Sequence, residues 1–249
     1  MGLKNIKLTI TYDGTAYHGW QRQRYGIITV QEMVETAISR ALGQSVTLRA
    51  SGRTDTGVHA LGQVANFSTD TPIPAQRMHR VITKYLPDDI RVIRAEEVGD
   101  DFDATLSARS KLYRYTVFND YEIPLAEKKY CYQYYYPCNL DAMQKAATQL
   151  IGEHDFASFT TFSLANKRKT TVRDLLRCQV WRKFHYIYFD TEATGFLYHM
   201  VRNIVGTLLD VGRGRISPDQ IPDILRACDR SAAGPMAPAQ GLCLRWVRY

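Results

Sequence analysis

The chain of 249 residues is 45% hydrophobic and 23% charged, a composition typical of folded globular proteins, so disorder and fibrous architecture are excluded. Its formal net charge of +7 is uneven, because residues 1–125 hold 15 Lys and Arg against 14 Asp and Glu, whereas residues 126–249 hold 17 against 11. A basic chain with 16 Tyr, 9 Phe and 3 Trp suggests a polyanionic partner, since cations neutralise phosphates and aromatic rings stack on bases.

The first half of the sequence predicts a mixture of strands and helices. Alternating apolar and polar residues predict a strand at 6–12, and apolar residues three and four positions apart predict an amphipathic helix over 29–42. Short strands at 46–50 and 64–68, a helix at 75–85 and a strand at 90–98 follow. The acidic stretch 96–103 interrupts both periodicities and predicts a linker.

The second half predicts a further unit of the same kind. We expect strands at 111–118, 129–136, 171–182, 184–192 and 242–247, with helices at 140–151, 195–211 and 218–227. His154 and Asp155 are interpreted as a helix-to-strand turn, and the glycines at 212 and 214 as a helix C-cap. The fold class is therefore α+β, with two α/β subdomains, residues 1–106 and 107–249, and mixed, mainly antiparallel sheets.

Most of the usual site signatures are missing from the sequence. There is no Walker A loop, no His-Glu-x-x-His and no Gly-x-Ser-x-Gly elbow, which argues against nucleotide, zinc and serine-hydrolase sites. The five cysteines fit neither a disulfide framework nor a zinc site, no apolar stretch approaches the about 20 residues of a membrane span, and no signal peptide is readable. We expect a cytoplasmic protein with reduced thiols, no membrane association and no metal.

One segment, residues 51–60, combines backbone freedom with charge directly after a predicted strand. Gly52 and Gly57 permit tight turns on both sides of Asp55, and Arg53 can pair with the Asp55 carboxylate and hold it ionised. An ionised, oriented carboxylate is a possible nucleophile. An Asp-x-Gly segment is also typical of a β-turn with a surface ion pair, so the residues alone leave both interpretations open.

The same segment carries a resemblance to a known family. Gly52-Arg53-Thr54-Asp55-Thr56-Gly57-Val58-His59-Ala60 resembles the signature of the tRNA pseudouridine synthase A family, which centres on one catalytic aspartate. Further blocks match that family in the same order, and the resemblance extends from about Leu8 to Val247. These blocks are residues 12–15, 19–23, 86–90, 113–115, 154–156, 199–206 and 241–242.

The resemblance implies a pseudouridine synthase fold, with two subdomains joined around a central RNA-binding cleft. It implies that Asp55 is the catalytic aspartate, that Arg53 is its partner and that Tyr113 contacts the target base. It further implies a set of substrate-binding residues, which are Gly52, Thr54, Gly57, His59, Arg202 and Leu242. From the residues alone, Tyr113 and Leu242 are more typical of a core, and Arg202 is equally typical of a helix surface.

The function that the resemblance implies is isomerisation of uridine to pseudouridine in the anticodon stem-loop of tRNA, at positions 38, 39 and 40. The resemblance implies a homodimer, and it implies no metal and no cofactor. Residues 167–169 and Arg173 are expected to follow tRNA phosphates. A non-catalytic tRNA-binding or RNA-folding protein and a nucleoside hydrolase or glycosylase stay open as alternatives.

The sequence departs from the family pattern at four positions. Asp103 and Thr105 stand where the family often has His and Arg, Thr83 where an asparagine is expected, and Leu112 where a basic residue is common. We expect these departures to affect tRNA affinity and site choice more than catalysis.

Overall fold

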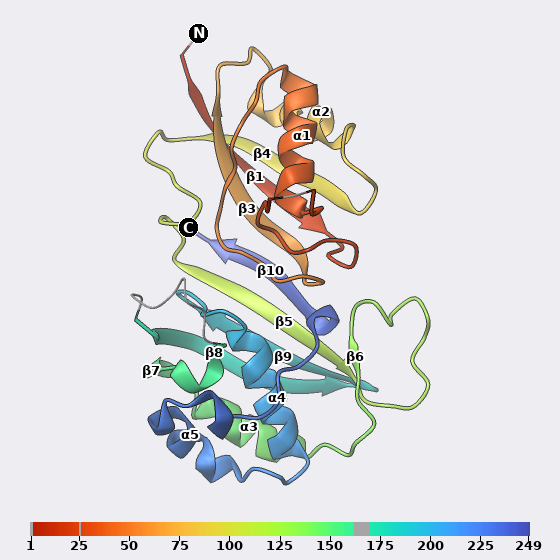
Figure 1. Ribbon diagram of the computed structural model, residues 1–249, viewed down its shortest axis with the longest axis vertical. Helices are drawn as coiled ribbons and strands as arrows, with labels where there is room; N and C mark the ends of the chain where they lie inside the picture. Colours follow the sequence, from red (N-terminus) through yellow and green to blue (C-terminus); the bar gives the residue numbers. More distant parts are fainter. Residues whose placement is uncertain (1, 25, 162–169) are drawn as a thin grey trace. The chain divides into compact units, whose positions relative to one another are not determined.

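The computed structural model describes residues 2–24, 26–161 and 170–249, and it divides the chain into two compact units (Figure 1). The first unit comprises Met1–Arg109 together with Cys243–Tyr249, and the second comprises Ser110–Leu242. Each unit combines helices with a sheet, which confirms the predicted α+β class.

The first unit contains a mainly antiparallel sheet in the order β4-β1-β3-β10. β1 pairs with both β3 and β4 in antiparallel register, β2 pairs with β3, and β10 runs parallel to β3. Cys243 on β10 lies opposite His59, the first residue of β3. The elements of this unit are β1 (Lys4–Tyr12), α1 (Val30–Leu42), β2 (Arg49–Ala50), β3 (His59–Thr69), α2 (Ala75–Thr83), β4 (Ile90–Val98) and β10 (Leu242–Arg248).

Helix α1 forms for reasons that are local in the sequence. Thr29 caps its first turn by accepting a hydrogen bond from the Glu32 backbone N–H, and Gly43 ends it in the left-handed conformation with φ of 71°. Its apolar side chains are spaced by three and four residues and are buried on one face of the helix. With α2, it covers one face of the first unit's sheet (Figure 1).

The second unit contains an antiparallel sheet in the order β5-β9-β8-β7, with β6 parallel to β5. Its elements are β5 (Ser110–Phe118), β6 (Tyr132–Gln133), α3 (Leu140–Thr148), β7 (Gly152–Asp155), β8 (Val172–Lys183), β9 (Tyr186–Ala193), α4 (Met200–Gly212) and α5 (Ile221–Ala227). Short 3-10 helices lie at Ala157–Phe159, Pro218–Gln220, Arg230–Ala232 and Ala239–Gly241.

Helix α4 is buried along most of its length, and it packs closely against the chain that follows α5. A Cβ atom at Gly206 would lie 1.6 Å from the backbone oxygen of Pro235, so only glycine allows this approach. The α4 helix thereby holds residues 234–237 in place. Within the described ranges, none of the helices combines the length and apolar character that crossing a membrane requires.

Several predicted elements differ from the observed ones. The strand predicted at 46–50 is reduced to β2, and the one at 129–136 to β6. His154 and Asp155 lie in strand β7 rather than in a turn, and α4 begins at Met200 rather than at residue 195. The apolar pattern of a short segment does not show whether a neighbouring strand is there to pair with it.

The predicted domain division into 1–106 and 107–249 stays a prediction. The boundary between the compact units lies between residues 109 and 110, and the last strand from Cys243 onwards belongs to the first unit. Of the basic residues expected to follow phosphates, 167–169 lie outside the described residues, and Arg173 is in β8.

Candidate active site

The Asp55 loop, residues 51–58, connects β2 to β3 in the first unit. Its entry is fixed by Gln63, which accepts a hydrogen bond from the Ser51 hydroxyl at 2.7 Å and donates one to the Gly52 backbone oxygen at 2.9 Å. Its exit is a turn closed by the Val58 N–H, which donates to the Asp55 backbone oxygen at 3.1 Å. Gly57 adopts a φ of 77° inside this turn, a conformation that favours glycine.

A second loop, residues 13–20, packs against the Asp55 loop. The Trp20 N–H donates to the Thr54 backbone oxygen at 3.0 Å, and a Cβ atom at Gly19 would lie 2.6 Å from that same oxygen. Likewise, a Cβ atom at Gly14 would lie 2.0 Å from the Val58 backbone oxygen. The two glycines therefore allow the 13–20 loop to approach the backbone on either side of Asp55.

A buried hydrogen bond between side chains reaches the Asp55 loop from β1. The Tyr12 hydroxyl lies 2.8 Å from the Thr54 hydroxyl, and both side chains are buried. Burial raises the pKa of Tyr12 well above its usual value, an effect that the hydrogen bond to Thr54 partly opposes, so the phenol is neutral at physiological pH. Thr54, which is predicted to bind substrate, is thus held in place by the neutral hydroxyl of Tyr12.

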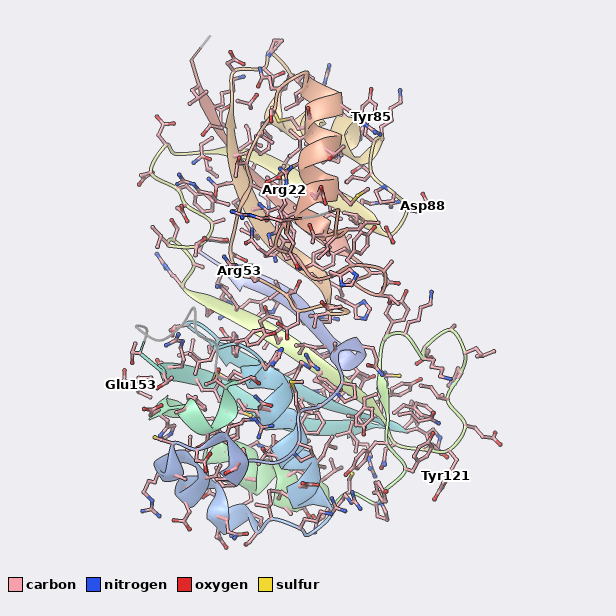
Figure 2. The ribbon with its side chains drawn as sticks, in the orientation of Figure 1. Arg22, Arg53, Tyr85, Asp88, Tyr121 and Glu153 are labelled. Carbon is pink, nitrogen blue, oxygen red and sulfur yellow. The ribbon has the colours of Figure 1, made fainter. Side chains whose placement is uncertain are left out.

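The first unit brings together six of the nine predicted site residues in this one loop and its boundary. Asp55 is half-buried. Arg53, which is labelled in Figure 2, is exposed. His59 is buried, and its Nδ1 atom accepts a hydrogen bond from the Gly14 N–H at 3.1 Å. The Asp13 carboxylate lies 3.2 Å from the same nitrogen. His59 therefore ties the start of β3 to the 13–20 loop.

The other three predicted residues lie in the second unit. Tyr113 on β5 is 7% exposed, and its ring makes an edge-to-face contact with Phe196, with centroids 5.1 Å apart. The neighbouring Tyr115 on the same face is fully buried and donates to the Pro238 backbone oxygen at 2.7 Å. Tyr113 is therefore held on a rigid, paired strand next to a firmly anchored neighbour.

The segment 234–242 contacts both Arg202 on α4 and the face of β5 that carries Tyr115, and it ends at Leu242. Arg202 on α4 donates from Nε to the Ala237 backbone oxygen at 2.8 Å, and the Ala237 N–H donates back to the Arg202 backbone oxygen at 3.1 Å. Gly241 is so close to the Tyr115 ring that a Cβ atom there would lie 2.6 Å from it. Leu242 follows directly and is 5% exposed.

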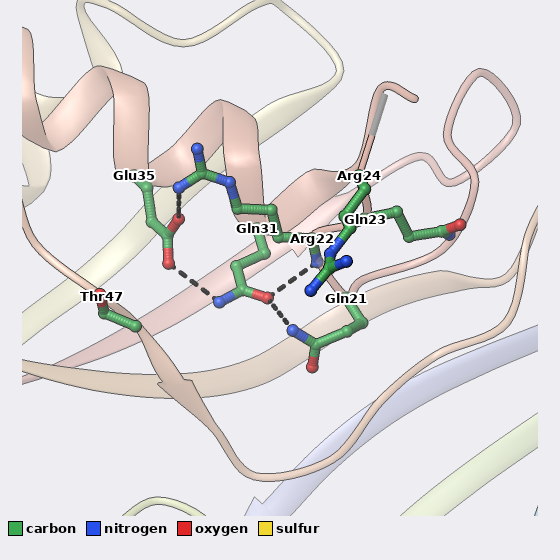
Figure 3. A pocket seen from close by; sticks show the side chains of 7 residues that line it. All are labelled: Gln21, Arg22, Gln23, Arg24, Gln31, Glu35 and Thr47. Atoms are coloured by element: carbon green, nitrogen blue, oxygen red, sulfur yellow. Dashed lines mark hydrogen bonds and ion pairs between the residues drawn. The ribbon is translucent and has the colours of Figure 1, made fainter. Parts of the chain in front are cut away.

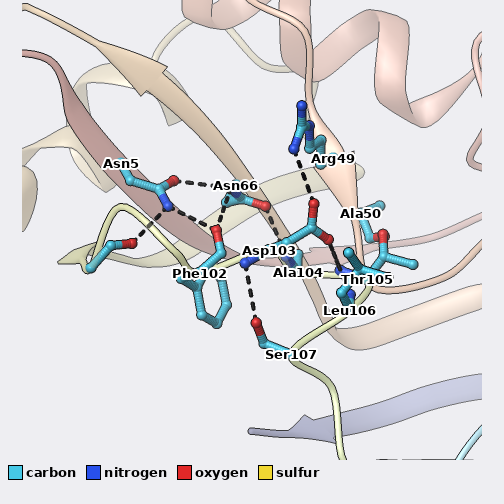
Figure 4. Close-up of polar contacts among 11 residues, drawn as sticks. Asn5, Arg49, Ala50, Asn66, Phe102, Asp103, Ala104, Thr105, Leu106 and Ser107 are labelled. Atoms are coloured by element: carbon cyan, nitrogen blue, oxygen red, sulfur yellow. Dashed lines mark hydrogen bonds and ion pairs between the residues drawn. The ribbon is translucent and has the colours of Figure 1, made fainter.

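The departures at Asp103 and Thr105 have local structural partners (Figure 4). Asp103 accepts hydrogen bonds from the backbone N–H groups of Thr105 and Leu106 at 2.8 and 3.0 Å, and it pairs with Arg49 at 3.1 Å. The Thr105 hydroxyl donates to the Ala50 backbone oxygen at 2.6 Å. Both side chains therefore hold the turn after β4 against β2, the strand that leads into the Asp55 loop.

Asp103 is anionic in this turn. Burial raises the pKa of its carboxyl, but the two backbone N–H groups and the Arg49 guanidinium outweigh burial and set the pKa below its usual value. The charge of this carboxylate is therefore stabilised by groups of the protein itself. For the described ranges, no group of three or more His, Cys, Asp or Glu side chains is arranged to hold a metal ion.

Sequence reasoning did not assign roles to Tyr12, Gly14 and Gly19, although all three lie in blocks that match the family. Their partners, Thr54 and Val58, are about 40 residues away in the chain. Only the presence of two glycines in a short loop signalled a close approach of backbones.

Comparison with known proteins gives a consistent result over nearly the whole chain. The family described as tRNA pseudouridine synthase matches residues 8–106 and 146–249. A protein of Thermoanaerobacter pseudethanolicus called tRNA pseudouridine synthase A is 44% identical over 248 residues, which cover 99% of this chain and 100% of that protein. A protein of the same name from Clostridium acetobutylicum is 40% identical over 247 residues, with 99% and 100% covered.

Among solved structures, a chain in the crystal structure of a Cbf5-Nop10-Gar1 complex is similar at 14% sequence identity and a TM-score of 0.39. The similarity covers 82% of this chain and 45% of that one.

Proposed function

The chain belongs to the tRNA pseudouridine synthase family, and from this membership we propose that it isomerises uridine to pseudouridine in tRNA with Asp55 as the catalytic carboxylate. The observation that carries the proposal is the support given to Asp55. Trp20, Gly19 and the Tyr12–Thr54 pair hold the backbone around it from one side, while the turn to Val58 closes the other. A carboxylate on so constrained a loop is pre-positioned for chemistry.

The reaction exchanges one glycosidic bond for another within the same nucleotide. The bond between N1 and C1′ breaks, the uracil turns over, and a bond between C5 and C1′ forms. The C5 position then loses its hydrogen as a proton, and N1 ends with a proton, so the formula is unchanged. No oxidant, reductant or second substrate is needed for this balance.

Asp55 can assist this exchange in three ways, each of which requires the ionised carboxylate. It can add to C1′ as the nucleophile of a retaining glycosidase does, attack C6 of the uracil, or remove the C2′ proton to give a glycal. Arg53, two residues away and exposed, is proposed to pair with the carboxylate and to fill the space that the flipped nucleotide vacates. Extrusion of the base costs a few kcal/mol, which such a filling contact offsets in part.

Tyr113 is proposed to contact the uracil and Leu242 to line the pocket around it. The remaining residues proposed to bind substrate have defined structural positions: Gly52, Thr54, Gly57 and His59 shape the Asp55 loop, and Arg202 is anchored on α4. Because these residues are fixed by hydrogen bonds or by backbone conformation, they hold the Asp55 loop and Arg202 in preformed positions for RNA binding.

The proposal includes three further expectations drawn from the family. The modified uridines are those at positions 38, 39 and 40 of the anticodon stem-loop, the active species is a homodimer, and the protein acts in the cytoplasm. The formal charge of +7 supports an RNA substrate, because electrostatic attraction to phosphates supplies much of the affinity for nucleic acid.

Tritium release tests the reaction and the role of Asp55 together. A tRNA transcript labelled with tritium at uridine C5 is incubated with the wild-type protein and with Asp55→Asn. We expect release from anticodon-arm uridines by the wild type and loss of release in the variant, because the amide is neither a base nor a nucleophile of comparable strength.

Two other results would overturn the proposal in different ways. Equal and undiminished tRNA binding by both proteins without tritium release from either would favour a non-catalytic RNA-binding protein. Free uracil in the reaction supernatant would favour a hydrolase or glycosylase, since rejoining at C5 leaves the base attached to the ribose.

A further inference from the structure

An open hollow on the first unit, of about 410 Å3, is lined entirely by polar and charged side chains (Figure 3). The residues that line it are Gln21, Arg22, Gln23, Arg24, Gln31, Glu35 and Thr47. Two of these are arginines and one is an acid, so the hollow carries an excess of positive charge. The two guanidinium groups favour an anionic ligand.

The wall of the hollow is a buried hydrogen-bond network on α1. The Gln31 side-chain oxygen accepts from the Gln21 amide at 2.7 Å and from the Arg22 backbone N–H at 2.9 Å, and its amide donates to Glu35 at 2.9 Å. Gln31 and Glu35 are only 5% and 6% exposed. Residues 21 and 22 are therefore fixed to the helix.

Arg22 is pre-organised by this network, although its side chain is 59% exposed. Its Nη1 atom lies 3.2 Å from the Glu35 carboxylate, whose other oxygen is occupied by Gln31 and by the Leu48 backbone N–H. A guanidinium has five N–H groups, so one bond to Glu35 leaves several of them available to a second acceptor.

Arg22 pairs with Glu35, whereas Arg24 has no hydrogen bond or ion pair with another described residue. Its side chain is exposed, and Figure 3 shows its guanidinium on the same hollow. A guanidinium that no carboxylate neutralises is well suited to phosphate, which it recognises through paired N–H groups.

The first residue that lines the hollow, Gln21, directly follows the 13–20 loop, which contacts the Asp55 loop. Trp20 donates to Thr54, and Gln21 follows directly in the chain. Residues 21–24 can extend at most about 14 Å from that contact, which is the length of a few nucleotides of RNA backbone. Both features belong to the first unit.

We propose that this hollow is a phosphate subsite for the backbone of the RNA beside the nucleotide that Asp55 acts on. Arg24 supplies the charge that neutralises the phosphate, and Arg22, held by Glu35, supplies a fixed second donor. The proposal rests on the proposed function for the identity of the RNA, and it adds the place where the strand is gripped.

The salt dependence of tRNA binding tests the subsite. The Kd of an unmodified tRNA transcript is measured between about 50 and 200 mM salt for the wild type, Arg24→Gln, Arg24→Lys and Arg77→Gln. Loss of one phosphate contact lowers the slope of log K against log salt by about 0.7 to 0.9. We expect this decrease for Arg24→Gln, together with several-fold weaker binding at the lowest salt, and a slope close to wild type for Arg24→Lys.

Arg77→Gln is the matched control, because Arg77 is an exposed arginine on α2 of the same unit and its loss changes the net charge equally. An unchanged slope in this variant supports a specific contact at Arg24. An unchanged slope in Arg24→Gln, or an equal decrease in Arg77→Gln, would overturn the subsite.

Binding and isomerisation fail independently in this design. If tritium release does not depend on Asp55 but the Arg24→Gln slope falls, the role proposed for Asp55 is wrong, and the contact between Arg24 and an RNA phosphate stands without its assigned place beside the reacting nucleotide. If release depends on Asp55 and the Arg24→Gln slope is unaffected, the proposed function stands and the subsite is wrong.

Discussion

The hydroxyl of Tyr12, the last residue of β1, lies 2.8 Å from the hydroxyl of Thr54, the residue before Asp55. Both side chains are buried, with exposed fractions of 4% and 6%. Because β1 is paired on both sides, by β3 and β4, this bond links the Asp55 loop to an interior strand of the first unit's sheet.

Replacement of Tyr12 by Phe tests whether this bond positions Asp55. The change removes one hydroxyl and leaves that of Thr54 buried without it, which costs about 1 to 3 kcal/mol of stability. We expect kcat to fall while KM for tRNA changes little. Thr54→Val and the double variant complete a thermodynamic cycle, in which coupled residues give less than additive losses. Strictly additive effects on kcat would show that the two hydroxyls act independently.

Gly19→Ala tests the close approach of the 13–20 loop. The new Cβ atom would lie 2.6 Å from the Thr54 backbone oxygen, and Gly19 has a φ of 83°. We expect a loss of stability of more than about 2 kcal/mol and strongly reduced tritium release, since the backbone beside Asp55 must move. Urea unfolding and the single-turnover rate measure the two effects.

Gly43→Ala is the control for that variant. Gly43 has a similar φ of 71°, but a Cβ atom there would have no neighbouring atom within 4 Å, so the variant reports the cost of left-handed backbone alone. We expect this variant to lose about 1 to 2 kcal/mol of stability and to keep a normal single-turnover rate. A Gly19 variant no worse than this control would contradict the steric argument.

Tyr113→Phe separates the hydroxyl of this residue from its ring. If the hydroxyl assists removal of the C5 proton, kcat should fall by about 100-fold while the edge-to-face contact with Phe196 and the fold are retained. Tyr115→Phe is the comparison, because it removes a hydrogen bond to Pro238 and should cost about 1 kcal/mol of stability instead. Full turnover by Tyr113→Phe would restrict Tyr113 to stacking.

Asp103→Ala should destabilise the protein by an amount that depends on pH. The pKa of Asp103 is lowered in the folded state, so its contribution is present above the unfolded value of about 3.9 and is lost as pH falls through the lower folded value. We expect a difference of about 1 to 2 kcal/mol from wild type at neutral pH.

That difference should shrink as the pH falls below the unfolded value of about 3.9 and the carboxyl becomes protonated. Urea unfolding at a series of pH values measures it, with Asp88→Ala as the control for an exposed aspartate of the same unit. A difference that stays constant into the acid range would show that Asp103 acts through its shape and not its charge.

The sequence predicts best those elements whose signals are local. Helix α1 was expected at 29–42 and is found at Val30–Leu42, because its cap, its apolar spacing and its terminal glycine all lie within the element or directly beside it. Strand β7 was missed because its pattern is only four residues long and its partner β8 begins 17 residues later. Short strands depend on pairing that local periodicity does not contain.

The candidate site shows the same limit. The nine-residue block around Asp55 could be recognised directly, and Asp103 could be seen as a departure from the family. That Asp103 would pair with Arg49, or Tyr12 with Thr54, could not be foreseen, since each pair is separated by more than 40 residues. Contacts of this kind exist only once the sheet has formed.

The position of β10 has a consequence for the order of events during synthesis. The first unit is completed by residues 243–249, and Cys243 lies opposite His59, where the Asp55 loop joins β3. A nascent chain that has emerged only as far as residue 240 therefore lacks one strand of the sheet beside its own candidate catalytic loop. We therefore expect the Asp55 loop to reach its final structure only after β10 has left the ribosome and paired with β3.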